Sequence, residues 1–124
     1  MNKKDVEKYI PIALKVLNKK FNEGVMPKAY NGYISSFGAS IIQSGLLPTL
    51  ALFENKQAHT KADKTYLTKI LLKILDENSD ESSLLKYVLN SEIDRNILKN
   101  RIIAAATAVK LAIRTFKLED MNNG

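Results

Sequence analysis

The sequence predicts an all-α protein, a compact bundle of about six helices forming a single domain over residues 1–124. Three observations lead to this fold class. Apolar residues recur at spacings of three and four in every long segment, convincing strand alternation is absent, and glycine, proline or short polar runs separate the segments. A length of 124 residues suits one ordinary core. We expect residues 1–2 and 119–124 to be frayed, as chain ends commonly are.

The first predicted helix covers residues 3–22, and Gly24 ends it. Its apolar stripe starts at Val6 and continues at spacings of three and four. Pro11 lies inside this pattern, and proline removes a backbone hydrogen bond and clashes with the preceding turn. We therefore expect either a kink or a helix that properly begins near Ile10.

The second predicted helix runs from residue 27 or 28 to residue 44, with Gly45 as its C-terminal stop. Gly32 and Gly38 weaken it, because each costs on the order of 1 kcal/mol relative to alanine inside a helix. We interpret both glycines as points where a neighbouring helix packs closely. A short third helix follows at residues 47–54.

The second half of the chain is predicted to form three further helices, at residues 63–76, 79–90 and 92–118. Ser79 or Asp80 can cap the fifth helix, and Ser91 with Asp94 resembles a capping box for the sixth. The sixth helix is the longest. Its predicted core stripe consists of Leu98, Ile102, Ala105, Val109, Ile113 and Phe116.

The formal net charge is +6, and it is unevenly distributed along the chain. Residues 1–75 carry twelve basic and five acidic side chains, whereas residues 76–92 carry one basic and five acidic side chains. Clustered lysine and arginine favour polyanionic partners, since they release condensed counterions from phosphates. The alternative is that the lysines only keep the protein soluble.

Several classes of protein are disfavoured by what the sequence lacks. No apolar run reaches the roughly 18 to 20 residues needed to cross a bilayer, and the first residues lead into no apolar signal core. The chain has no cysteine, which fits a reducing compartment. We expect a soluble, cytoplasmic protein that does not contact a membrane.

No motif of catalysis or metal binding is apparent. His59 is the only histidine and lies in a polar connector. The run from Asp76 to Asp80 begins like a calcium loop, but Glu81 occupies the position that needs glycine and Tyr87 the position that needs glutamate. Phosphate-binding loops and nucleophile elbows are also missing. We predict no metal, no cofactor and no enzymatic activity, although acid and base catalysis by ordinary side chains stays open.

Basic side chains form ridges on two predicted helices. The first helix carries lysines opposite its apolar stripe, and the last carries lysines, arginines and Lys117 on one flank. Arginine binds phosphate bidentately or stacks on a base. For each ridge, the alternative is a face that only contacts solvent. Lys69 and Lys73 lie off the proposed flank. The predicted RNA-binding residues are Lys15, Lys19, Lys61, Lys64, Arg95, Lys99, Lys110 and Arg114.

Three aromatic residues of the second predicted helix, Tyr30, Tyr33 and Phe37, lie at spacings of three and four. They could stack on bases, but the spacing favours burial in the core or a contact with a neighbouring subunit. We keep them as candidates for a subunit contact.

Residues 30–53, which read YNGYISSFGASIIQSGLLPTLALF, resemble the small-subunit family of the type III-B CRISPR Cmr effector complex. That family has an aromatic-led helix, an Ile-Ile-Gln-x-Gly-Leu junction and a following helix of the Thr-Leu-Ala-Phe type. The C-terminal helix is similar as well, but more loosely. A tryptophan common in the family is missing near Ile113, as is an acidic residue that often follows the Ala-Thr pair.

This resemblance implies a non-catalytic, all-helical subunit that acts in antiviral defence. It further implies that copies stack into a short filament beside other Cmr subunits and line the groove where guide RNA pairs with target RNA. Target cleavage in such complexes is attributed to the backbone subunit. The small subunit of the related Csm complex is one alternative, and a helical adaptor without nucleic-acid binding is another.

Overall fold

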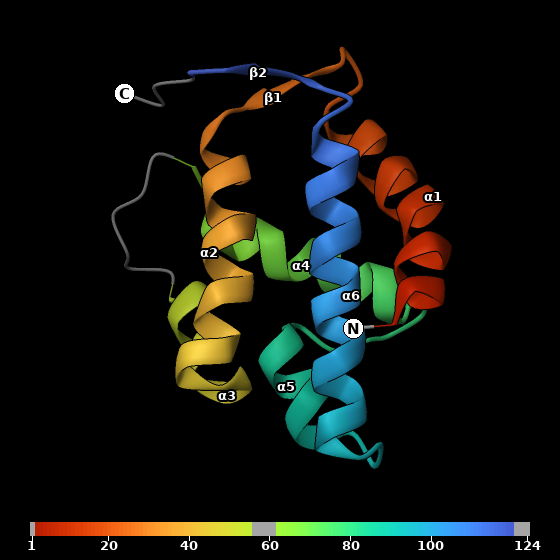
Figure 1. Cartoon of the computed structure of the whole chain (residues 1–124), viewed down its shortest axis with the longest axis vertical. Helices are drawn as coiled ribbons and strands as arrows, with labels where there is room; N and C mark the ends of the chain where they lie inside the picture. The colour runs from red at the N-terminus through yellow and green to blue at the C-terminus, as the bar shows by residue number, and fades with distance from the viewer. Residues whose placement is uncertain (1, 56–61, 121–124) are drawn as a thin grey trace.

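The computed structural model describes residues 2–55 and 62–120. Within these ranges the chain forms six helices and two short strands, which build one bundle (Figure 1). The predicted all-α fold class is confirmed. In chain order the elements are α1 (Lys3–Lys20), β1 (Val25–Pro27), α2 (Ala29–Ser44), α3 (Leu46–Phe53), α4 (Lys64–Leu75), α5 (Leu84–Asn90), α6 (Arg95–Ile113) and β2 (Lys117–Glu119).

Helix α6 is the centre of the bundle. It packs along α1 over most of its length, contacts α2 on its other side and crosses α4 behind (Figure 1). Every member of the predicted core stripe from Leu98 to Phe116 is buried. Small side chains on α6 let the neighbouring helices approach closely. Its buried alanines are Ala104, Ala105, Ala106, Ala108 and Ala112.

Helix α1 runs without interruption through Pro11, so the prediction of a helix that starts near Ile10 is wrong. Pro11 is exposed, and so is Glu7, whose carbonyl loses its usual partner at position 11. Water can therefore hydrate that carbonyl. The long contact between α1 and α6 outweighs the remaining cost of the proline.

The close packing predicted at Gly32 and Gly38 is also wrong. Apart from the glycine's chain neighbours and the adjacent backbone of α2, no described atom lies within 4 Å of the Cβ that an alanine would add at either position. Gly45 differs, because its φ of +93° is a conformation that residues with a side chain rarely adopt. It ends α2 and lets α3 begin at once.

The two strands were not predicted. They pair in parallel, with Val25 opposite Lys117 and Met26 opposite Leu118. The backbone N–H of Lys117 donates to the carbonyl of Gly24 at 2.9 Å. A three-residue pairing between segments so far apart in the chain leaves no periodic pattern in the sequence, which explains why it was missed.

This pairing shortens the last helix and orders the end of the chain. Helix α6 ends at Ile113, where prediction placed the end at residue 118. Glu119 was predicted to be frayed, but its carbonyl accepts a hydrogen bond of 2.8 Å from the N–H of Lys28. Asn2, also predicted to be frayed, caps α1 by accepting from the N–H of Lys4.

The helix starts differ from prediction at two places. Ser83, not Ser79 or Asp80, caps α5, and its hydroxyl accepts from the N–H of Lys86. Asp94 is itself the cap of α6 and accepts from the backbone of the next turn. Both caps place a short polar side chain where the first helical N–H groups lack a partner.

Candidate nucleic-acid interface

The predicted RNA-binding residues do not form one surface. They fall into a set on α6, a set between α1 and α4, and Lys64 at the start of α4. Lys61 lies outside the described residues, as does His59. The three locations have different surroundings, so each is considered separately.

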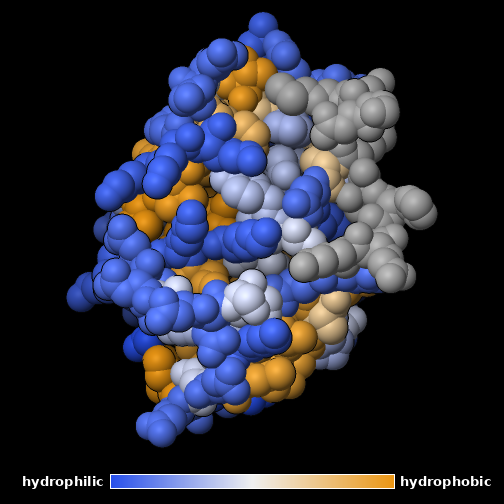
Figure 2. Space-filling model, turned by 180° about the vertical axis from the view of Figure 1, so that it is seen from behind, coloured by the Kyte–Doolittle hydropathy of each residue, from blue (hydrophilic) through white to orange (hydrophobic). Residues whose placement is uncertain are grey.

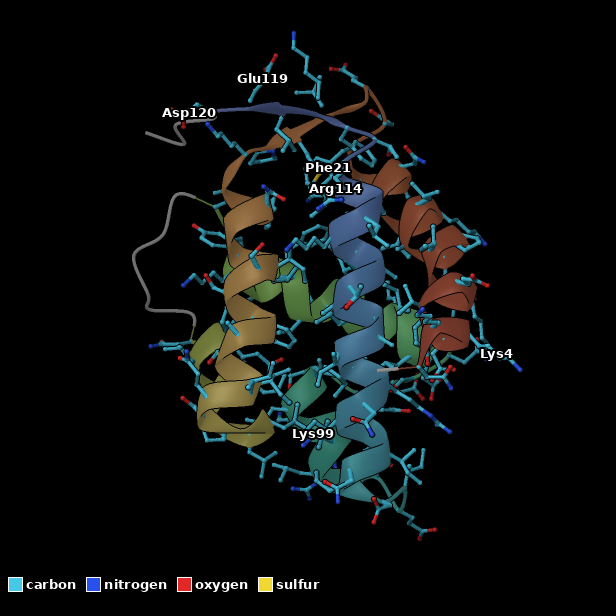
Figure 3. All side chains as sticks on the ribbon, in the orientation of Figure 1. Lys4, Phe21, Lys99, Arg114, Glu119 and Asp120 are labelled. Carbon is cyan, nitrogen blue, oxygen red and sulfur yellow. The ribbon has the colours of Figure 1, made fainter. Side chains whose placement is uncertain are left out.

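The first location is one side of α6, formed by Arg95, Lys99, Lys110 and Arg114, which we call the α6 flank. Both arginines are exposed and both lysines are half-buried. Figure 3 shows Arg114 at the upper end of α6 and Lys99 beside its lower part. At 1.5 Å per residue the flank spans about 28 Å.

The α6 flank has a uniform sign of charge along the helix. No acidic residue occurs between residues 95 and 118. Lys117, which the sequence placed on the same flank, lies instead in β2, where its ammonium is 3.4 Å from the carboxylate of Glu119. The flank therefore ends at Arg114.

The second location is a groove between α1 and α4, which we call the α1/α4 groove. It encloses a cavity of about 580 Å³, and a cavity of about 270 Å³ adjoins it. The groove has a basic rim and an apolar floor. Figure 2 views the molecule from the side of α4, where apolar surface is visible between hydrophilic side chains. The rim is formed by Lys15, Lys19, Lys20, Lys69 and Lys73, and the floor by Ile12, Val16 and Tyr66.

Tyr66 connects the rim and the floor of this groove. The ammonium of Lys20 lies 5.2 Å from the centre of its ring, within the range of a cation–π contact. Burial raises the pKa of Tyr66 to about 12. The lining also includes carboxylates, with Glu77 in both cavities and Asp76 and Glu81 in the smaller one.

Sequence reasoning missed this groove. Lys69 and Lys73 were placed off the proposed flank, yet Lys73 lines the same cavity as Lys15 and Lys19, and Lys69 lines the adjoining one. A helical wheel describes one helix at a time, so it cannot show that basic faces of α1 and α4 converge. The one available signal was that both helices carry several lysines in addition to an apolar stripe.

At the third location, the side chain of Lys64 contacts aromatic rings. Its ammonium lies 5.1 Å from the ring centres of both Tyr33 and Phe53. Lys64 is half-buried, so these contacts compete with any phosphate for its charge. RNA binding by Lys64 stays a prediction.

The aromatic residues of α2 contribute mainly to the core. Tyr30 and Phe37 are buried, and Tyr33 is half-buried. The hydroxyl of Tyr30 donates to the carbonyl of Asp63 at 3.1 Å, and burial raises the pKa of Tyr30. The burial that their spacing favoured is confirmed for Tyr30 and Phe37. A subunit contact by these residues stays a prediction. Of the three, only Tyr33 is exposed enough to contact another subunit.

The acidic turn after α4 forms local hydrogen bonds. The carboxylate of Asp76 accepts from the N–H of Asn78, and that of Glu81 accepts from the side chain of Asn90 at 3.0 Å. Over residues 2–55 and 62–120, no three His, Cys, Asp or Glu side chains come together as ligands of one metal ion. In the same ranges, no helix has the length and apolar character required to cross a membrane.

A comparison with protein families gives one match. The family described as CRISPR-associated protein (Cas_Cmr5) matches residues 6–112. Searches among curated proteins and among solved structures each returned no significant match. The family match extends over most of the 124 residues and confirms the resemblance first seen at residues 30–53. The chain belongs to the Cas_Cmr5 family of CRISPR-associated proteins, whose members associate with other Cmr subunits.

Proposed function

We propose that this chain is a non-catalytic small subunit of a type III-B Cmr complex in antiviral defence, and that it supports guide and target RNA through the α6 flank. The composition of the α6 flank is the observation that supports the RNA contact. It presents two arginines and two lysines over about 28 Å without an acidic neighbour on the helix. Cleavage of the target is assigned to another subunit.

The chemistry of the α6 flank suits a phosphate backbone. Arg95 and Arg114 offer planar forks for bidentate contacts, and Lys99 and Lys110 add point charges between them. Such contacts neutralise phosphates without reading bases. Base pairing with the guide supplies the sequence specificity, as in other RNA-guided effectors. The subunit therefore needs no base-reading motif.

The α1/α4 groove is less suited to RNA. Its floor of Ile12, Val16 and Tyr66 would stay uncovered under a phosphate backbone, and Glu77 would repel it. Binding of RNA by Lys15 and Lys19 stays a prediction. Their position in a groove with an apolar floor supports a protein partner instead.

The test compares two double charge reversals in the reconstituted complex. Lys110→Glu with Arg114→Glu should impair retention of target RNA more than Lys4→Glu with Lys86→Glu. The two variants change net charge equally, so long-range attraction alone predicts similar losses. Lys4 and Lys86 are both exposed, and Lys4 projects from the far side of α1, away from Arg114 (Figure 3).

Lys69 and Lys73 would not serve as a control, because both side chains line the α1/α4 groove. Equal losses in the two variants, or none in either, would contradict an RNA contact at the α6 flank. Equal losses would mean that the RNA surface lies elsewhere, and no loss in either would favour a helical adaptor whose basic residues only interact with solvent. Retention of the other Cmr subunits by both variants would show that assembly is intact.

A further inference from the structure

Another cavity, with a mainly polar lining, lies where α1, α4, α5 and α6 meet. Its volume is about 310 Å³, at the lower end of the roughly 300–1,000 Å³ typical of small-molecule sites. Figure 1 shows the beginning of α1 and the end of α4 next to each other beside α6. None of its described lining residues belongs to the α6 flank or the α1/α4 groove. The polar lining residues are Asp5, Lys8, Tyr9, Tyr87 and Arg101.

The hydroxyl of Tyr9 reaches this cavity without a protein partner. Only 6% of Tyr9 is exposed, and its hydroxyl makes no hydrogen bond to any residue in 2–55 or 62–120. Every fully buried polar side-chain atom in these ranges does have a partner. The Tyr9 hydroxyl is therefore not fully enclosed by protein, and the cavity is the space that it reaches. A phenol with a buried ring and an unpaired hydroxyl offers a donor to a ligand.

Tyr87 and Arg101 line the same space as Tyr9. Burial raises the pKa of both phenols, and the positive charge of Arg101 opposes that shift in both. The guanidinium therefore lies near both hydroxyls, which stay protonated at neutral pH and can donate. Lys8 precedes Tyr9 on α1 and adds an exposed ammonium to the lining. Two phenols and two cations thus provide hydrogen-bond donors around one small space.

Carboxylates also act on these phenols. Burial and then the charge of Asp5 raise the pKa of Tyr9, and burial and then Asp76 raise that of Tyr87. Asp5 lines the cavity itself, and no ion pair within the described residues involves it. The cations would attract a bare anion, but Asp5 would repel it. A ligand that carries both an anionic group and a hydroxyl suits all of these groups, because a carboxylate accepts from a hydroxyl.

We propose that this cavity binds a small phosphate monoester that also carries hydroxyl groups. The phosphate lies against Lys8 and Arg101 and accepts from the phenols, and a hydroxyl of the ligand donates to Asp5. A phosphate offers three acceptor oxygens to these donors, whereas a carboxylate offers two. The site is independent of the proposed function. At 100° per residue, Arg101 lies on the opposite face of α6 from the α6 flank, to which RNA is assigned.

Isothermal titration calorimetry of the full chain, freed of RNA, tests this proposal with glycerol 3-phosphate as the probe. We expect one ligand per chain and a Kd of about 1 mM or lower. Glycerol, which lacks the anionic group, should not bind. Sulfate, which lacks a hydroxyl, should bind more weakly than glycerol 3-phosphate because Asp5 repels it. Asp5→Ala should strengthen sulfate binding and reduce the preference for glycerol 3-phosphate.

Two further substitutions test the donors against matched controls. Arg101→Gln should weaken binding of glycerol 3-phosphate by about tenfold or more, whereas Arg95→Gln, the same change on the α6 flank, should leave it unchanged. Tyr9→Phe should weaken binding by about two- to tenfold, and Tyr66→Phe, which removes a phenol outside this cavity, should have no effect. Tyr9→Phe should not lower the thermal unfolding midpoint, because the hydroxyl that it removes has no described protein partner.

Several results would overturn the proposal. They are no binding of glycerol 3-phosphate at about 10 mM, equal losses in Arg101→Gln and Arg95→Gln, or a Tyr9→Phe variant that is less stable but keeps its affinity. A 5′-phosphorylated RNA that bound through Arg101 while glycerol 3-phosphate did not would assign the cavity to an RNA end instead. Arg101→Gln should leave retention of target RNA by the complex unchanged, so failure of this proposal and failure of the proposed function are separate results.

Discussion

The carboxylate of Glu54 accepts a hydrogen bond of 3.0 Å from the backbone N–H of Leu84, thirty positions later in the chain. Its other oxygen accepts from the N–H of Leu85 at 3.1 Å. These N–H groups belong to the first turn of α5, where no helical carbonyl is available. Glu54 thus joins the end of α3 to the beginning of α5 and places a negative charge at the positive end of that helix.

We expect Glu54→Ala to lower the free energy of unfolding by about 1–2 kcal/mol, as the loss of a capping side chain usually does. Urea denaturation measures this change. Glu92→Ala removes an equal charge at an exposed site and should change stability by less than about 0.5 kcal/mol. Equal effects of the two substitutions would mean that the cap contributes nothing beyond its charge.

Gly32→Ala should stabilise the isolated protein by about 0.5–1 kcal/mol, because α2 is helical there and nothing described lies near the added methyl group. Gly45→Ala is the matched control and should destabilise, since its φ is +93°. Thermal denaturation of both variants measures the difference. A destabilising Gly32→Ala would reveal a close neighbour of α2 that the structure does not place there.

Stability should fall as pH rises above about 10. Burial raises the pKa of Tyr66 to about 12 in the folded protein, whereas the ordinary tyrosine value is 10.0. Between these values the unfolded chain releases the phenol proton and the folded chain keeps it, so rising pH favours unfolding. Tyr66→Phe should make the loss between pH 10 and 12 shallower in urea titrations. An unchanged pH dependence would show that the phenol of Tyr66 ionises freely when folded.

Salt dependence tests how the α6 flank binds RNA. If Lys110 neutralises one phosphate, Lys110→Ala should reduce the slope of log affinity against log salt by about 0.7 for single-stranded RNA. The reduction should be the same for RNAs of different sequence, since phosphate contacts carry no base information. Lys86→Ala, an exposed change on α5, should leave the slope as it was.

Purified protein, treated with chelator and freed of contaminating nuclease, should not cleave RNA or hydrolyse nucleotides. The sequence has no thiol and one histidine, and it lacks a phosphate-binding loop. Gel assays with added Mg²⁺ or Mn²⁺ measure this. Cleavage that depended on metal and vanished in Asp76→Ala or Asp80→Ala would show that the acidic turn is a metal site.

The sequence by itself predicted the fold class, the approximate helices and the family. Periodicity at three and four reports which face of a helix is buried, so the stripe from Leu98 to Phe116 was correct at each position. The helix ends were less accurate. Tertiary hydrogen bonds decide them, as the capping of α5 by Ser83 and Glu54 and the end of α6 at Ile113 show.

Function depends on which surfaces meet, and only the tertiary structure decided that. Each basic ridge was visible in the sequence as a pattern on a single helix. The convergence of Lys15 and Lys19 with Lys73 depends on how α1 packs against α4, which local spacing does not encode. Likewise, the engagement of Lys64 by Tyr33 and Phe53 requires α2, α3 and α4 to be in place. Side-chain periodicity is a property of one helix, whereas a groove is a property of two.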